Sequence, residues 1–297
     1  MITWKRSNER LAAALLLAGA VILSNPCAGV ITNGVVMIST NTAWAEEQYV
    51  IQELTVGNGA TLAVAGGSTL EVAGTFAIVG SNSAVRCEGK NRAGMVNSNW
   101  LGVGVVIFAS NVVVEAGARL HADGQGYTSV GLFQRGNGPG GGAGGGGAGG
   151  GGGGYGGRGG DGNGGGGGGT YGSQYYPGDL GSGGGCGDNG TPTGHGGGAI
   201  TLNVADTLTL DGVISANGLH GTANDCAGGA GGSILVRTGT LNGSGRFTAN
   251  GGNGTTWAGA GGGGRIAVYY RAQNFSGFTN STVSAGTPRP GGAGTIA

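Results

Sequence analysis

Apolar and polar residues alternate along the chain in short runs that predict β-strands. In the run at 200–204, every second side chain is apolar. Related runs contain Ile234 and Ile266, and a fragment of another contains Ile296. Counted from Ile200, the successive spacings of these isoleucines are 34, 32 and 30 residues. A period of this length, combined with strand alternation, predicts a stacked β-solenoid.

A second repeated phrase follows these runs: an apolar residue, any residue, Ala, and then Asn, Asp or Gly. Its copies begin at Leu120, Ile214, Phe247 and Val283. The small Ala suits a tight interior corner, and Asn and Gly accept the left-handed backbone that a bend requires. The phrase therefore predicts a ladder of turns, with the aligned residues Asp123, Asn217 and Asn250.

Each repeat contains three apolar runs, which predicts three strands per coil. In one repeat they lie at 200–204, 208–210 and 213–216. An all-β parallel β-helix accounts for this layout, whereas a propeller or sandwich would show hairpin turns and longer strands. The high glycine content disfavours helix.

The residue pattern of region 1–45 predicts an export signal. It has a basic start, an apolar stretch of 13 residues at 11–23 and a small-x-small motif before Glu46. We expect a mature chain that begins near Glu46, is secreted or held at the cell surface, and has no membrane segment. The alternatives are an N-terminal membrane anchor that includes 29–38 and a lipoprotein modified at Cys27.

Two further regions follow the predicted signal. Region 46–100 contains short strand-like runs separated by glycine turns, and we expect a cap or the first rungs there. Region 101–297 contains the β-helix rungs, which a glycine-rich insertion at 136–198 interrupts.

Glycine supplies 78 of the 297 residues, a level typical of low-complexity chains. Between 140 and 170 only seven residues are not glycine, and five of them share one phase of a three-residue period. These five are Ala143, Tyr155, Arg158, Asp161 and Thr170. Three residues per turn predicts extended helices of the polyproline II type, packed on one flank of the solenoid. The alternative is a flexible glycine loop that does not order.

The charge balance argues against several classes of partner. Lys and Arg total 14, Asp and Glu total 14, and the formal net charge is zero. This balance removes the usual electrostatic reason to expect nucleic acid or an anionic membrane as partner. The glycine tracts lack the lysine and the strand-to-helix switch of a phosphate loop, and Cys/His clusters of zinc-site spacing are absent. We expect no metal and no cofactor.

Three cysteines lie beyond the predicted signal. Cys186 and Cys226 stand in glycine-rich excursions before successive rungs, and in an exported protein they are expected to form a disulfide. Cys87 is left over and is expected to be free, buried or intermolecular.

The sequence shows no catalytic residue set. β-Helices often serve carbohydrate-active enzymes, and glycosidases need two carboxylates that converge across a cleft. Asp206 and Asp211 lie in one coil, and their convergence with neighbouring arginines would indicate an enzyme. His121 and His220 adjoin predicted turns and are expected at the surface. We therefore expect no enzyme, with a polysaccharide lyase or hydrolase as the alternative.

The phrase at 259–270, together with 291–296, resembles a glycine-rich β-helical module of exported bacterial surface and adhesin-like proteins. The resemblance covers about 100–297. It implies the β-helical architecture and a surface-associated location, and it implies no particular activity. In such proteins the module usually continues past the strand that contains Thr295 and Ile296.

An open solenoid edge is a template for another chain. We expect the last rung, at Thr295 and Ile296, to accept the first strand of a second copy. The residues of that strand are Tyr49, Val50, Ile51, Leu54 and Val56. Addition of this kind does not close, so it builds a filament. The leading hypothesis is an exported structural protein that assembles with itself into an extracellular fibre or biofilm matrix; the alternatives are a monomeric surface adhesin or a carbohydrate-active β-helix enzyme.

Aromatic residues in and beside the glycine tracts allow two interpretations. These residues either stack on surface glycans or other chains, or pack onto the solenoid flank and hold the tracts in place. They are Tyr155, Tyr171, Tyr175, Tyr176 and Trp257.

Overall fold

The computed structural model describes residues 20–22, 34–146, 148–188, 193–222 and 225–297. Its strands form two sheets in which neighbouring strands run parallel. The ten-stranded sheet contains β1 (Ala20–Ile22), β2 (Val35–Ile38), β4 (Gln48–Ile51), β5 (Glu53–Val56), β7 (Thr69–Ile78), β9 (Val105–Val114), β11 (Ala199–Leu210), β13 (Ser233–Gly243), β15 (Arg265–Phe275) and β16 (Thr295–Ile296). The six-stranded sheet contains β3 (Thr42–Trp44), β6 (Thr61–Val64), β8 (Ala84–Cys87), β10 (Arg119–His121), β12 (Val213–Ser215) and β14 (Arg246–Thr248). A short 3-10 helix, Gly277–Asn280, follows β15.

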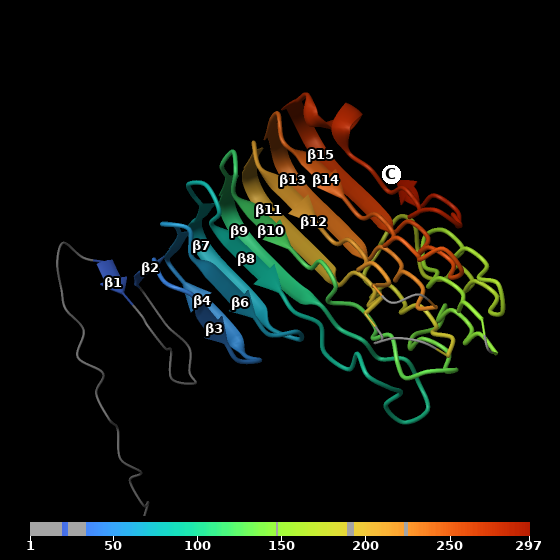
Figure 1. Cartoon of the computed structure of the whole chain (residues 1–297). Helices are drawn as coiled ribbons and strands as arrows, with labels where there is room; N and C mark the ends of the chain where they lie inside the picture. Colours follow the sequence, from blue (N-terminus) through green and yellow to red (C-terminus); the bar gives the residue numbers. More distant parts are fainter. Residues whose placement is uncertain (1–19, 23–33, 147, 189–192, 223–224) are drawn as a thin grey trace, which may run out of the picture.

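Successive coils stack along one axis, which confirms the predicted parallel β-helix (Figure 1). The chain crosses the ten-stranded sheet, turns into the six-stranded sheet, and returns one strand further on. The repeated isoleucines are direct neighbours, because Ile200 pairs with Ile234 and Ile234 pairs with Ile266. The sequence period is therefore the length of one coil.

Each repeat contributes two strands instead of the predicted three. In β11 the first two predicted strands are one continuous strand, and its register shifts between Val204 and Thr207. Two consecutive exposed residues, Ala205 and Asp206, interrupt the alternation without ending the strand. The prediction of three strands per coil was wrong, because a bulge can absorb an irregularity in the pattern.

The core lies between the two sheets. Alternate side chains of the long strands are fully buried, as at Ile107, Leu202 and Val236. The alanines of the repeated turn phrase, Ala122, Ala216 and Ala249, are also fully buried, which agrees with the predicted tight interior corner. Burial of these apolar surfaces supplies the main stabilisation of the stack.

Three strands inside the predicted export signal belong to the two sheets, and the first of them, β1, pairs with β2. β2 pairs with β5, and β3 pairs with β6. Trp44 is 2% exposed, and its ring stacks on Tyr49 with the ring centroids 4.7 Å apart. The basic start of the signal and Cys27 lie outside the described residues. Cleavage before Glu46 stays a prediction, and it would remove three paired strands.

The glycine tracts gather on one flank of the solenoid (Figure 1), where they form an ordered bundle of extended segments. Segment 226–232 illustrates the arrangement, because its backbone N–H groups point to three neighbours in rotation. Gly228 and Gly231 donate to 259–262, and the residues on either side of them donate to two other segments. The full set of bonds is Ala227 to Gly185, Gly228 to Gly259, Gly229 to Leu219, Ala230 to Ser182, Gly231 to Gly262 and Gly232 to Ala216, all at 2.7–3.1 Å.

Three further segments donate to the carbonyls of 226–232, at Gly228, Gly229 and Ala230. This segment therefore has six hydrogen-bonded neighbours. A helix with three residues per turn directs its N–H groups along three directions and forms no internal hydrogen bonds, so it needs such neighbours when it is buried. The predicted packing of extended helices of the polyproline II type is confirmed, and the alternative of an unordered loop is excluded for the described tracts.

Close approach of backbones explains why this bundle is made of glycine. A Cβ atom on Gly152 would lie 1.9 Å from the carbonyl oxygen of Ala260, and one on Gly228 would lie 2.0 Å from that of Gly252. Neither glycine has a left-handed backbone, so the requirement is for space and not for an unusual φ. We call this arrangement, built from the described tracts between 140 and 294, the glycine bundle.

Candidate functional site

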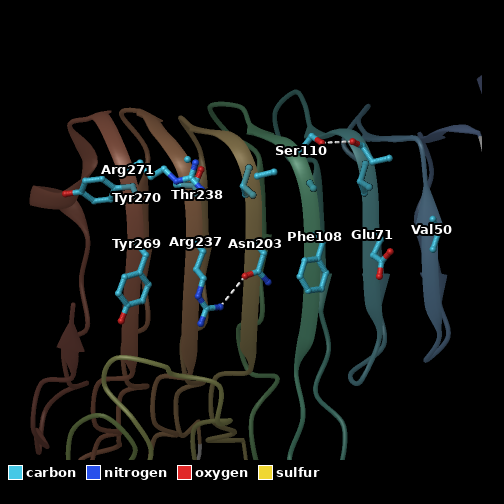
Figure 2. Close-up of a pocket in the computed structure, with 16 residues that line it drawn as sticks. Val50, Glu71, Phe108, Ser110, Asn203, Arg237, Thr238, Tyr269, Tyr270 and Arg271 are labelled. Carbon is cyan, nitrogen blue, oxygen red and sulfur yellow. Dashed lines mark hydrogen bonds between the residues drawn. The ribbon is translucent and has the colours of Figure 1, made fainter.

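A groove runs along the outer face of the ten-stranded sheet (Figure 2). A row of outward side chains crosses six neighbouring strands, with one side chain from each strand at equivalent register. In order from β4 to β15, the row consists of Val50, Glu71, Phe108, Asn203, Arg237 and Tyr269. Each member directly follows a buried core residue of its strand, so the β-alternation of the long strands orients the row outward.

Small residues form the part of the groove beside this row. Ala73, Ser110, Ala205 and Gly239 line it at the point where the long strands bend. The register shift in β11 lies at the same point, between Val204 and Thr207. The bend and the short side chains leave a depression of about 710 Å³.

Exposed aromatic side chains border the groove. Phe108 is 44% exposed, and Tyr269 and Tyr270 stand at the β15 end. Tyr176, which is 65% exposed, comes from the glycine-rich insertion and stacks near Tyr269 with centroids 6.1 Å apart. The Tyr269 hydroxyl donates to the carbonyl of Tyr175 at 2.6 Å, which fixes the insertion beside this end of the groove.

The charges in the groove are unevenly distributed. Arg237 lies over the Tyr176 ring, and its Nη1 donates to Oδ1 of Asn203 at 3.2 Å. Arg271 lines the same end and makes no hydrogen bond or ion pair with the described residues. At the other end, the carboxylate of Glu71 accepts a hydrogen bond from Nε2 of Gln48 at 3.0 Å.

Asp206 and Asp211 do not converge. Asp206 lines a small hollow beside Arg271, whereas Asp211 lies at the turn after β11. Oδ1 of Asp211 accepts hydrogen bonds from the backbone N–H and the hydroxyl of Ser244, at 2.9 and 3.1 Å. The arrangement required of a glycosidase carboxylate pair is therefore missing at these two residues.

His121 and His195 are largely buried within the fold. The side chain of His121 is only 12% exposed, so the expectation of a surface position was wrong. Its Nδ1 lies 3.6 Å from Oδ2 of Asp123, but burial outweighs this carboxylate and lowers the pKa of His121. Nδ1 of His195 accepts the backbone N–H of Ser129 at 2.9 Å, and burial lowers the pKa of His195 as well. Among the described residues, no group of three or more His, Cys, Asp or Glu side chains is arranged to hold a metal ion.

The predicted turn residues are joined by hydrogen bonds from coil to coil. Oδ1 of Asp123 accepts the backbone N–H of Asn217, and Oδ1 of Asn217 accepts that of Asn250, at 2.7 and 2.8 Å. Oδ1 of Asn250 accepts the backbone N–H of Ser284 at 2.8 Å. The ladder thus extends one coil beyond the three residues named from the sequence.

The predicted assembly strand is divided in two. Tyr49, Val50 and Ile51 belong to β4, which pairs with β7 on one side only within the described chain. Leu54 and Val56 belong to β5, which lies between β2 and β7. The second half of the strand is therefore not an open edge while β2 is present. At the other end of the stack, Thr295 and Ile296 pair with Arg265 and Ile266.

Cys186 and Cys226 form a disulfide, with their Cα atoms 4.1 Å apart. A structural disulfide is typical of an oxidising compartment. The remaining described cysteine, Cys87, is fully buried and has a free thiol. Across the part of the chain that the structure covers, we find no helix with the length and hydrophobicity needed to cross a membrane.

The aromatic residues of the glycine tracts divide between the two interpretations. Tyr155 is fully buried, and its hydroxyl lies 2.7 Å from that of Ser233, at the start of β13. The carbonyl of Tyr171 accepts hydrogen bonds from Arg265 at 2.9 and 3.2 Å. These two tyrosines fix the glycine bundle to the solenoid, whereas Tyr176 and Trp257 are exposed.

The groove has no recognisable signature in the sequence. Its row combines apolar, acidic, amide, basic and aromatic residues, so no motif marks it. A usable signal was present nonetheless, because Phe108, Asn203 and Arg237 each follow an inward apolar residue at the same point of the repeat. Comparison with known proteins gives no further assignment: no protein-family model, no curated protein and no solved structure matches this chain.

Proposed function

We propose that the chain is an exported structural protein that assembles with itself into an extracellular fibre or matrix by head-to-tail stacking of solenoids. The observation that supports this most directly is the constant register of the coils. β11 pairs with β9 on one side and β13 on the other through the same residues, Ile200 to Val204. A coil that accepts its neighbour in this way is complementary to a coil of a second chain as well.

The outer edge of β4 is the proposed joint. The carbonyl of Glu47 accepts the N–H of Thr69 on the β7 side, whereas the N–H of Gln52 points away from β7 to the carbonyl of Gly34. Backbone groups of successive residues point to opposite sides of a parallel strand, so those of Val50 point to the same side as those of Gln52. The described strands leave this side of Val50 unpaired.

Electron microscopy and sedimentation of the native protein test the proposal. We expect filaments from the native protein, dispersed particles from Val50→Pro, and filaments from the matched control Val50→Thr. Proline removes the outward N–H while leaving the bonds of Tyr49 and Ile51 to β7 intact. A native protein that remains monomeric at high concentration would contradict the proposal.

A monomeric surface adhesin is the second candidate, and the groove is the observation that favours it. A carbohydrate-active enzyme has less support, because Glu71 is the only carboxylate among the residues that line the groove. Both candidates share the exported location, for which the disulfide and the resemblance to exported surface proteins provide support.

A further inference from the structure

We propose that the groove on the outer face of the ten-stranded sheet binds an extended acidic polysaccharide that lies across the strands. The groove is formed within one solenoid, so this proposal does not depend on assembly. Its residues come from β4, β7, β9, β11, β13 and β15 and from no other molecule.

The spacing of the row suits a sugar chain. Neighbouring strands are about 4.8 Å apart, so the five intervals from Val50 to Tyr269 span roughly 24 Å. One pyranose unit of an extended glycan is similar in length to one strand interval, which is about 4.8 Å. A glycan that follows the solenoid axis therefore meets one outward side chain per sugar over about five units.

The chemistry of the row also suits a sugar chain. Phe108 and Tyr269 present partly exposed rings, on which the apolar faces of sugars can stack. Asn203 lies between them in the row and can exchange hydrogen bonds with hydroxyl groups. The small residues Ala205 and Gly239 beside the row leave room for a flat ring to approach the backbone.

Two arginines favour an acidic chain. Arg271 makes no hydrogen bond or ion pair with the described residues, and Arg237 has one side-chain hydrogen bond, to Asn203. A guanidinium presents five N–H donors in a fork that matches a carboxylate. The one carboxylate of the groove, Glu71, lies toward the opposite end and is held by Gln48. Carboxylated sugars bound near β13 and β15 would provide hydrogen-bond acceptors and negative charge for both arginines.

An extended peptide fits less well. Peptides that bind sheets usually add a strand at an open edge, where main-chain hydrogen bonds supply affinity. The strands beneath the centre of the groove, from β7 to β13, are paired on both sides. The groove therefore offers side chains, and not unpaired backbone groups, to a ligand. Side-chain contacts of this kind suit a carbohydrate better than an extended peptide.

Isothermal titration calorimetry with hexagalacturonate tests the proposal on the native protein. We expect binding that weakens as salt rises, because exposed charges are screened. Phe108→Ala, Arg237→Gln and Arg271→Gln should each weaken binding about tenfold, the equivalent of one lost charged or stacking contact. Arg246→Gln, on the opposite sheet, and Trp257→Ala, an exposed aromatic residue in the glycine bundle, are matched controls that should leave binding unchanged.

Two further probes make the result decisive. Cellohexaose tests the requirement for acid groups, and a hexaglutamate peptide tests the carbohydrate assignment. Hexagalacturonate binding at least tenfold tighter than either probe supports the proposal. No binding of hexagalacturonate, equal binding of either probe, or equal affinity of the groove variants and the controls overturns it. Circular dichroism melting confirms in each case that the variant is folded.

Discussion

Oδ1 of Asp123 accepts the backbone N–H of Asn217 at 2.7 Å, although 94 residues separate them. Asn217 repeats the contact with Asn250 on the next coil, so each side chain substitutes for a backbone partner at the turn. We expect Asn217→Ala to lower the free energy of unfolding by about 1–2 kcal/mol, because the N–H of Asn250 loses its acceptor. Urea unfolding measures the change.

The matched control for this variant is Asn163→Ala. Asn163 is exposed, and its side chain makes none of the hydrogen bonds of the ladder. A loss as large in the control as in Asn217→Ala would mean that the ladder contributes nothing beyond the general cost of replacing asparagine.

The glycine bundle predicts opposite results for two identical substitutions. Gly152→Ala forces a Cβ to within 1.9 Å of the carbonyl oxygen of Ala260, so we expect a loss of about 2 kcal/mol or more. A Cβ on Gly169 meets no atom within 4 Å. Gly169→Ala should therefore leave stability unchanged or raise it by about 0.4–1 kcal/mol, by restricting the unfolded chain. Equal thermal midpoints for the two variants would show that close approach of backbones is not the reason that these positions require glycine.

The sequence predicted the solenoid and the bundle because both are periodic structures. The spacing of Ile200, Ile234 and Ile266 gives the coil length, and the three-residue phase of the insertion gives the number of hydrogen-bonding directions. The predicted separate strands at 200–204 and 208–210 were wrong, because whether an irregularity ends a strand or forms a bulge depends on the neighbouring strand.

The groove was harder to predict for a related reason. Glu71, Phe108 and Arg237 share no chemistry, and only the pairing of β7, β9, β11 and β13 brings them into one row. Asp206 and Asp211 are close in sequence, but the bend and the following turn direct them to different places. Proximity along the chain was therefore misleading, and position within the repeat was informative.

Thiol labelling tests the environment of Cys87. Full burial raises the pKa of its thiol to about 12, so almost no thiolate forms at neutral pH and reagents cannot reach the sulfur. We expect no thiol to react in the native protein without reductant, and one to react after denaturation if Cys27 has been removed with the signal. Rapid labelling of native protein would show that β8 is not packed as described.

Acid should destabilise the attachment of the glycine bundle at His195. Burial, and after it Arg92, lower the pKa of His195 in the folded protein, and its Nδ1 must remain unprotonated to accept the N–H of Ser129. The unfolded histidine titrates near pH 6.5, so the unfolded chain binds more protons below that value. Stability should therefore be full above about pH 6.5 and decline as pH falls toward the lowered pKa.

His195→Asn separates this effect from general acid denaturation. The asparagine Oδ1 can accept the same N–H and does not titrate. Thermal melts between about pH 7.5 and 5 should show a smaller decline than in the native protein. The decline should not disappear, because burial also lowers the pKa of His121. An unchanged slope in His195→Asn would rule out this histidine as a source of the pH dependence.

The N-terminal strands predict a difference between two forms of the protein. A chain that begins at Gly34 retains β2 and β3, whose buried Val36, Ile38 and Trp44 each contribute about 2–3 kcal/mol of burial. A chain that begins at Glu46 loses these contacts and exposes one edge of β5 and of β6. We expect the shorter chain to be less stable in urea and to assemble more readily, since Leu54 and Val56 then become open. Sedimentation compares the two forms, and mass spectrometry of the exported protein identifies the natural start.

The rotation of hydrogen bonds within the glycine bundle restricts how its tracts can change in evolution. Gly151 and Gly154 donate to the same neighbouring segment, and Gly150 and Gly153 donate together to a different one. Deleting one residue would turn every later N–H by about a third of a revolution, toward the wrong neighbour. Deleting three would preserve every direction. Insertions and deletions in these tracts should therefore be tolerated in multiples of three, as in a reading frame, although here the frame is set by geometry and not by the genetic code.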